Sequence, residues 1–196
     1  MKKPLIILTG PTAVGKTSLS IALAKAVNGE IISADSMQVY RHMDIGSAKI
    51  RPEEMQGVPH HLVDCLEPDE EFNVVRFQQM AKEAMKGIYD RGRIPVLVGG
   101  TGFYIQAVTG DIDFTVHGED TTYRQMLEEK AKTEGAQVLH EMLAAVDPAS
   151  AAAIHTNNVK RVIRALEYYR QTGKPISQHN EEQRQKESPY NLAYFV

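Results

Sequence analysis

The sequence predicts an α/β fold in which a parallel sheet forms the core and a helical segment is inserted. Short apolar runs alternate with helical periodicity up to about residue 108, a pattern typical of parallel sheets. A glycine-rich loop joins the first strand to the first helix. From Gly110 onward the chain has the periodicity of helices alone, and strand character returns only at residues 190–196.

The first strand is expected at residues 5–8, and a helix is expected from the end of the next loop to Asn28-Gly29. Glycines in that loop allow backbone N–H groups to turn inward and cradle phosphate oxygens, while its lysine neutralises charge and its threonine hydroxyl can hold Mg²⁺. The sequence therefore predicts a P-loop NTPase-like core. The expected phosphate-binding residues are Gly10, Pro11, Thr12, Ala13, Val14, Gly15, Lys16 and Thr17.

The remaining core elements follow in alternation. Strands are expected at residues 30–34, 61–66 and 94–98, and helices at residues 74–89 and 103–108. Asp35 follows the second strand, and the turn containing Thr101 follows the fourth. Because ligands bind beyond the carboxyl ends of strands in such sheets, we expect one pocket to collect the loop, Asp35 and this turn.

Composition places few limits on function. The chain of 196 residues has a net charge of −3, so its overall charge does not favour binding to nucleic acid. Its single cysteine, Cys65, excludes an internal disulfide, and no cysteine pattern indicates zinc. The first apolar stretch is too short for a membrane span. We expect a cytoplasmic protein that does not enter a membrane.

The inserted segment is expected to hold three helices, at residues 123–132, 136–145 and 159–171. The last of them carries most of a dense basic patch whose only acid is Glu167. A solvated helix face and a nucleic-acid contact are equally good interpretations of such a patch. Its basic residues are Lys160, Arg161, Arg164, Arg170 and Lys174.

The chain carries a set of ordered motifs at residues 10–17, 33–40, 43–49, 58–61, 98–104, 146–148, 154–155 and 161–167. Together these motifs span nearly the whole chain, and several blocks in the right order are more specific than any one of them. In this order they resemble the motifs of the bacterial tRNA dimethylallyltransferases.

The resemblance implies transfer of a dimethylallyl group from its diphosphate to N6 of the adenosine beside the anticodon of tRNA. It makes Asp35 the base that takes the amine proton, with Thr101 and Lys16 as the other catalytic residues. Mg²⁺ would be the cofactor, held by Thr17. The residues that the resemblance implies for tRNA binding are Asp35, Ser36, Met37, Gln38, Thr101, Arg124, Lys160, Arg161 and Arg164.

On this basis we expect a catalytic core at residues 1–113, an RNA-binding insertion at 114–187, and a strand at 188–196 that returns to the core. We expect a monomer that binds the anticodon stem-loop and dimethylallyl diphosphate. The family's pattern continues past position 196, into a segment with an arginine that supports the diphosphate, so we expect either a truncated form or a sequence of which part is not represented.

Three alternatives remain open. A small-molecule kinase could use the same loop for ATP, with Asp35 acting on a hydroxyl. The second alternative is a prenyltransferase of free adenine nucleotides, which would need no insertion that binds RNA. An RNA-binding module without chemistry is the third. His60 and His61 are expected to be structural or to contact RNA, since adjacent strand residues point to opposite faces and cannot readily share a metal.

Overall fold

The computed structural model describes residues 2–11, 14–114 and 121–196. Residues 1–112 together with 187–196 form one compact unit, and residues 113–186 form a second. Within the described ranges, no helix combines the length and the apolar character needed to cross a lipid bilayer.

The first unit is built on a parallel sheet whose strand order is β3-β2-β4-β1-β5. The second, fourth and first strands lie in its centre, where apolar residues bury both faces. The predicted α/β class with a parallel sheet is thus confirmed. The strands are β1 (Lys3–Thr9), β2 (Gly29–Ser33), β3 (His60–His61), β4 (Ile94–Gly99) and β5 (Tyr190–Phe195).

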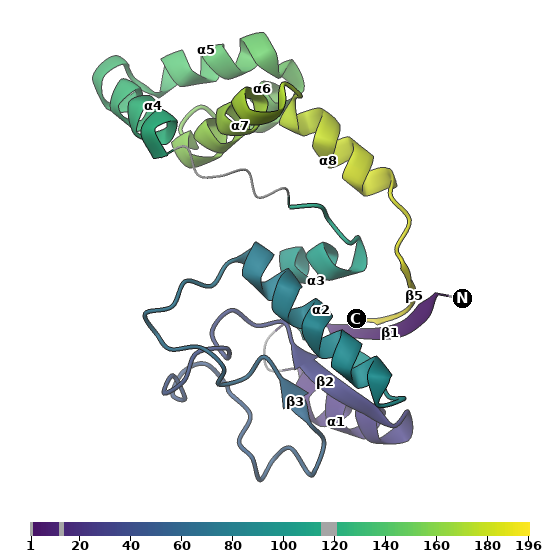
Figure 1. Ribbon diagram of the computed structural model, residues 1–196. Coiled ribbons are helices and arrows are strands. Elements are labelled where there is room, and N and C mark those ends of the chain that lie inside the picture. The colour runs from purple at the N-terminus through teal and green to yellow at the C-terminus, as the bar shows by residue number, and fades with distance from the viewer. Residues whose placement is uncertain (1, 12–13, 115–120) are drawn as a thin grey trace. The chain divides into compact units, whose positions relative to one another are not determined.

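Helices cover both faces of this sheet (Figure 1). α2 (Val74–Asp90) and α3 (Gly102–Thr109) bury their apolar residues against one face, and α1 (Lys16–Ala26) packs on the other. Asn73 begins α2, because its side chain accepts hydrogen bonds from two backbone N–H groups of the first turn.

The third strand is shorter than the sequence indicated. We expected residues 61–66, but β3 contains only His60 and His61. Leu62 and Asp64 both have left-handed backbones, with φ of 61° and 51°, which bend the chain out of the extended conformation. Leu66 then makes only an isolated parallel bridge to Tyr40.

The second unit contains five helices in its described part, two more than expected. α4 (Thr121–Glu134), α5 (Ala136–Val146) and α7 (Val159–Thr172) match the predicted three. Helices α6 (Pro148–Ala153) and α8 (Ile176–Gln185) were not predicted from the sequence. Helix α8 buries none of its residues, so it lacks the apolar periodicity on which such a prediction depends.

A buried carboxylate joins α6 to α8. Asp147, 1% exposed, accepts hydrogen bonds from the backbone N–H of Ser150 and from both the N–H and the hydroxyl of Ser177. Burial alone would raise the pKa of Asp147, but these donors favour the charged form and lower it. Asp147 therefore caps α6 and fixes the start of α8.

Candidate active site

The strands end together at one edge of the sheet. Thr9 of β1 pairs with Gly99 of β4, and Ser33 of β2 pairs with Val98 of β4. The segments that follow the three strands therefore leave from the same edge. They carry the glycine-rich loop, Asp35 and Thr101.

The glycine-rich loop has the backbone that its glycines were expected to allow. Gly10 and Gly15 have φ of 145° and 85°, which other residues rarely adopt. Gly15 is the N-cap of α1, so the helix begins at Lys16. The ammonium group of Lys16 donates a hydrogen bond to the carbonyl of Pro11. A helix N-terminus at the end of such a loop is suited to binding phosphate.

A close backbone contact places Asp35 next to the turn after β4. A Cβ at Gly99 would lie 2.3 Å from the carbonyl oxygen of Ala34, so only glycine fits there. The N–H of Ala34 donates to the carbonyl of Val98 at 2.7 Å. These contacts fix Ala34, and with it Asp35, against the turn that leads to Thr101.

One oxygen of Asp35 organises its own loop. Oδ1 accepts the N–H groups of Met37 at 2.8 Å and Gln38 at 3.4 Å, as in an Asx turn. Among the residues that the structure describes, no donor bonds to Oδ2. Asp35 therefore stabilises its own loop through one carboxylate oxygen and keeps the other oxygen available for chemistry.

The amide of Gln38 is held from three sides. Its Oε1 accepts from the hydroxyl of Ser33 at 3.1 Å, and its Nε2 donates to the carbonyls of Ser47 and Ala48 at 3.4 and 3.2 Å. Ser33, Ser47 and Ala48 were not predicted from the sequence to lie at this site. All four residues line the same pocket.

A buried ammonium group anchors the loop that supplies those carbonyls. Lys49 donates to the carbonyl of Tyr40 and to the carboxylates of Asp44 and Asp64, at 2.7, 2.8 and 2.5 Å. Burial alone would lower the pKa of Lys49, but the two carboxylates outweigh it and raise that pKa. Asp64, which had no role in the sequence analysis, belongs to this structural network.

The adjacent histidines divide between two faces of the sheet. His60 lines the pocket, and its Nδ1 donates to the carbonyl of Val58 at 2.8 Å. Burial lowers the pKa of His60, which favours the neutral form of the ring. His61 bonds instead to the carboxylate of Glu30 at 2.6 Å. No group of three or more metal-ligating side chains occurs among the described residues.

Glu30 is a buried charge with several partners. Its carboxylate accepts from the guanidinium groups of Arg91, at 2.9 and 2.7 Å, and of Arg93, at 3.1 Å, besides the ring of His61. The hydrogen bonds from Arg91 are the largest influence and lower the pKa of Glu30 to about 2. No sequence pattern predicts this cluster, since only the fold brings its members together.

A pocket of about 610 Å³ collects most of the predicted core-site residues. Ser36, Met37 and Val14 are not among the lining residues, and Thr12 and Ala13 lie outside the described residues. Val14 and Met37 are 59% and 43% exposed. The predicted residues that do line the pocket are Gly10, Pro11, Gly15, Lys16, Thr17, Asp35, Gln38 and Thr101. Thr101 also occupies the N-cap position of α3, but its side chain makes no capping hydrogen bond.

The remaining predicted residues belong to the second unit. Lys160, Arg161 and Arg164 are exposed on α7, whose apolar residues face the core of that unit. Arg124 extends from α4 and forms a two-bond ion pair with Glu167.

Comparison with known proteins assigns these features to a family. Residues 38–196 match the family model described as IPP transferase, and residues 3–65 match the one described as isopentenyl transferase. The chain is 69% identical to a tRNA dimethylallyltransferase of Lachnoclostridium phytofermentans, over 99% of the chain and 62% of that protein. It is 53% identical to the protein of the same name from Bacillus subtilis, over 97% of the chain and 60% of that protein.

Solved structures agree with this. A full-length tRNA isopentenylpyrophosphate transferase from Bacillus halodurans is 50% identical with a TM-score of 0.63, over 98% of this chain and 59% of that one. A eukaryotic dimethylallyltransferase acting on tRNA is 33% identical with a TM-score of 0.82, over 98% of this chain and 47% of that one. The chain spans about three fifths of the length of the curated relatives that it matches. The chain belongs to the IPP transferase family.

Proposed function

We propose that this chain carries the catalytic core of a tRNA dimethylallyltransferase. The reaction transfers the dimethylallyl group of dimethylallyl diphosphate to N6 of the adenosine beside the anticodon, and releases diphosphate. The observation that carries this proposal is the single pocket lined by Lys16, Thr17, Asp35 and Thr101. A phosphate cradle and a carboxylate base in one pocket fit an alkyl transfer in which diphosphate leaves and an amine loses a proton.

The glycine-rich loop is proposed to hold the diphosphate. As the allylic C1–O bond breaks, its electron pair goes to the diphosphate oxygen, where negative charge develops. Backbone N–H groups between Gly10 and Lys16 and the ammonium group of Lys16 stabilise that charge. Donors fixed before the reaction need no reorganisation at the moment of bond cleavage.

The residues present also fit a magnesium ion. The hydroxyl of Thr17 and the carboxylate of Asp35 line the pocket, and oxygen atoms are the ligands that Mg²⁺ prefers. We propose that Thr17 supplies the protein ligand next to the diphosphate oxygens. When bound, Mg²⁺ neutralises charge on the leaving diphosphate.

Asp35 is proposed as the base. The adenine amine is a weak nucleophile, because its lone pair is delocalised into the ring. As N6 forms its bond to C1 of the dimethylallyl group, Oδ2 of Asp35 accepts one amine proton while Oδ1 keeps the loop in place. Thr101, opposite the loop, is proposed to place its hydroxyl next to the reacting groups, and Gln38 to contact the target base.

Residues 113–186 are proposed to bind the anticodon arm. Lys160, Arg161 and Arg164 would contact phosphates, which gives binding that weakens with salt. The target base must leave its stack to reach the pocket, as in other enzymes that act on a base. We propose that the protein acts as a monomer in the cytoplasm.

The test is transfer of label from radioactive dimethylallyl diphosphate to unmodified tRNA. It uses this chain and, in parallel, a chimera extended past Val196 by the corresponding part of the L. phytofermentans relative. We expect label in RNA that depends on Mg²⁺, and no label in tRNA whose target adenosine is replaced by guanosine. Absence of label with both proteins would refute the proposal. ADP release that an added alcohol or nucleotide stimulates would favour a kinase instead.

A further inference from the structure

The cationic surface of α7 contains one acid. Lys160, Arg161 and Arg164 are exposed, and within residues 2–11, 14–114 and 121–196 no carboxylate forms an ion pair with them. Glu167, on the same helix, is 8% exposed.

The position of Glu167 on the helix would allow its carboxylate to pair with these cations in place of an external ligand. It follows Arg164 by three residues and Lys160 by seven, and a helix has about 3.6 residues per turn. Glu167 therefore lies almost in line with Lys160 and one turn after Arg164. Residues three apart on a helix are neighbours that can form an ion pair.

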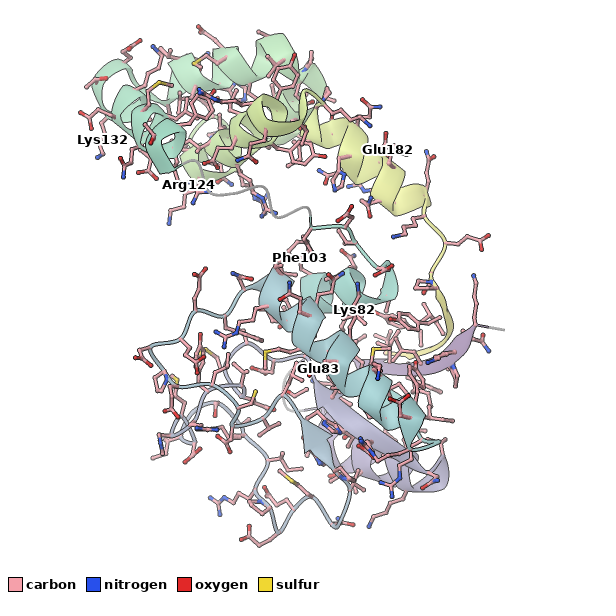
Figure 2. All side chains as sticks on the ribbon, viewed as in Figure 1. Lys82, Glu83, Phe103, Arg124, Lys132 and Glu182 are labelled. Carbon is pink, nitrogen blue, oxygen red and sulfur yellow. The ribbon has the colours of Figure 1, made fainter. Side chains whose placement is uncertain are left out.

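Another helix already holds this carboxylate. From α4, Nε of Arg124 donates to Oε1 of Glu167 at 3.0 Å, and its Nη2 donates to Oε2 at 2.9 Å. This parallel two-bond geometry is the strongest and most directional form of an arginine–carboxylate pair. Figure 2 labels Arg124 and Lys132, which lie at different parts of α4.

The other cation within one turn of Glu167 is also held by α4. The guanidinium carbon of Arg170 lies 4.1 Å from the ring centroid of Tyr123. If Arg124 were absent, the partly buried carboxylate of Glu167 would be left without its partner, which is costly. Arg164 is the cation placed to replace it, and that pairing would withdraw Arg164 from an external ligand.

We propose that Arg124 is a positioning residue, which occupies Glu167 and so keeps the charge of Arg164 available to RNA phosphates. This inference rests on the proposed function, because it assumes that α7 binds RNA. It differs from the expectation that the resemblance gave, in which Arg124 itself touches RNA. The two assignments differ in one respect: only the indirect role can be rescued by changing Glu167.

The experiment compares the affinity of four proteins for an anticodon stem-loop RNA between 50 and 200 mM salt. They are the unaltered chain, Arg124→Gln, Glu167→Gln and the double variant. We expect Arg124→Gln to bind about fivefold more weakly and to reduce the slope of log affinity against log salt by about one, as for one lost phosphate contact. We expect the double variant to recover both values, and Glu167→Gln alone to bind at least as well as the unaltered chain.

Lys132→Gln is the matched control, since it removes one positive charge from α4, and among the described residues Lys132 forms an ion pair only with the exposed Glu129, at 3.7 Å. It should leave the salt slope unchanged. A double variant that stays as weak as Arg124→Gln, while both remain folded by circular dichroism, would overturn the inference and favour direct contact. If the unaltered chain binds no RNA, the proposed function itself fails, and that result differs from a failed rescue.

Discussion

Asp35 is the residue on which the proposed chemistry depends most. Its Oδ1 holds the N–H groups of Met37 and Gln38, so a substitution that removes this oxygen would disturb the loop as well as the base. Asparagine keeps an acceptor oxygen but cannot take a proton. Asp35→Asn therefore separates the two roles of the residue.

We predict that Asp35→Asn lowers kcat/KM for tRNA prenylation by about 10²–10⁴-fold, the usual contribution of a general base. Binding of dimethylallyl diphosphate should change little, because the glycine-rich loop remains. Label transfer and equilibrium dialysis measure the two quantities. Asp69→Asn, at an exposed position, is the control and should be fully active. Unchanged turnover in Asp35→Asn would rule out this carboxylate as the base.

Glu30 should make stability depend on acidity. Its pKa falls from 4.5 to about 2 in the folded chain, so its ion pairs stabilise the fold above about pH 4.5 and are lost as the pH falls toward 2. We predict that Glu30→Gln costs about 2 kcal/mol at pH 7, a value reduced for solvent screening because Arg91 and Arg93 are 49% and 38% exposed. Urea unfolding at pH 7 and pH 3 tests this. The prediction would be contradicted if the unaltered chain and Glu30→Gln differed in their free energy of unfolding by the same amount at pH 7 and at pH 3.

At the scale of helices and strands, the sequence predicted most of the core sheet correctly. Continuous apolar runs identified β1, β2 and β4, since strands buried on both faces carry such runs. The same signal failed at residues 61–66, where left-handed residues end β3 early. Helix α6 could have been found, because Asp147 followed by Pro148 is a helix-start signal. Helix α8 gave no comparable signal.

The Asp147 cap is predicted to decide whether the helices after α5 keep their arrangement. Asp147→Ala removes three hydrogen bonds to a buried carboxylate and should destabilise the second unit by about 2–3 kcal/mol. Ser177→Ala, which keeps its backbone bond, should cost only about 1 kcal/mol. Thermal unfolding followed by circular dichroism measures both. Equal effects of the two substitutions would show that the carboxylate is not the main contributor.

At the scale of the whole molecule, motif spacing could predict which residues share the pocket, because parallel strands end at one edge. It could not predict the neighbours of Gln38 or of Glu30, because no sequence pattern links these residues and only the fold brings their side chains together. Charge counting found the patch on α7, but not the pairing of Arg124 with Glu167 that only the fold reveals.

The presence of residues 113–186 predicts a preference for an RNA acceptor over a free nucleotide. We expect AMP in millimolar excess to leave label transfer to tRNA nearly unchanged and to receive no label itself. AMP lacks the other phosphates of the anticodon arm, which α7 would contact, so it would bind without those electrostatic contacts. Efficient prenylation of AMP would instead identify a prenyltransferase of free nucleotides.

The central claim is that one pocket holds the departing diphosphate and the attacking amine together. The most direct measurement is a crystal structure of the complete enzyme with a thiolo analogue of dimethylallyl diphosphate and an anticodon stem-loop. We predict diphosphate oxygens on the N–H groups between Gly10 and Lys16, and N6 of the extruded adenine within hydrogen-bonding distance of the Asp35 carboxylate. Diphosphate and adenine in separate cavities, with Asp35 facing neither reacting atom, would contradict the account.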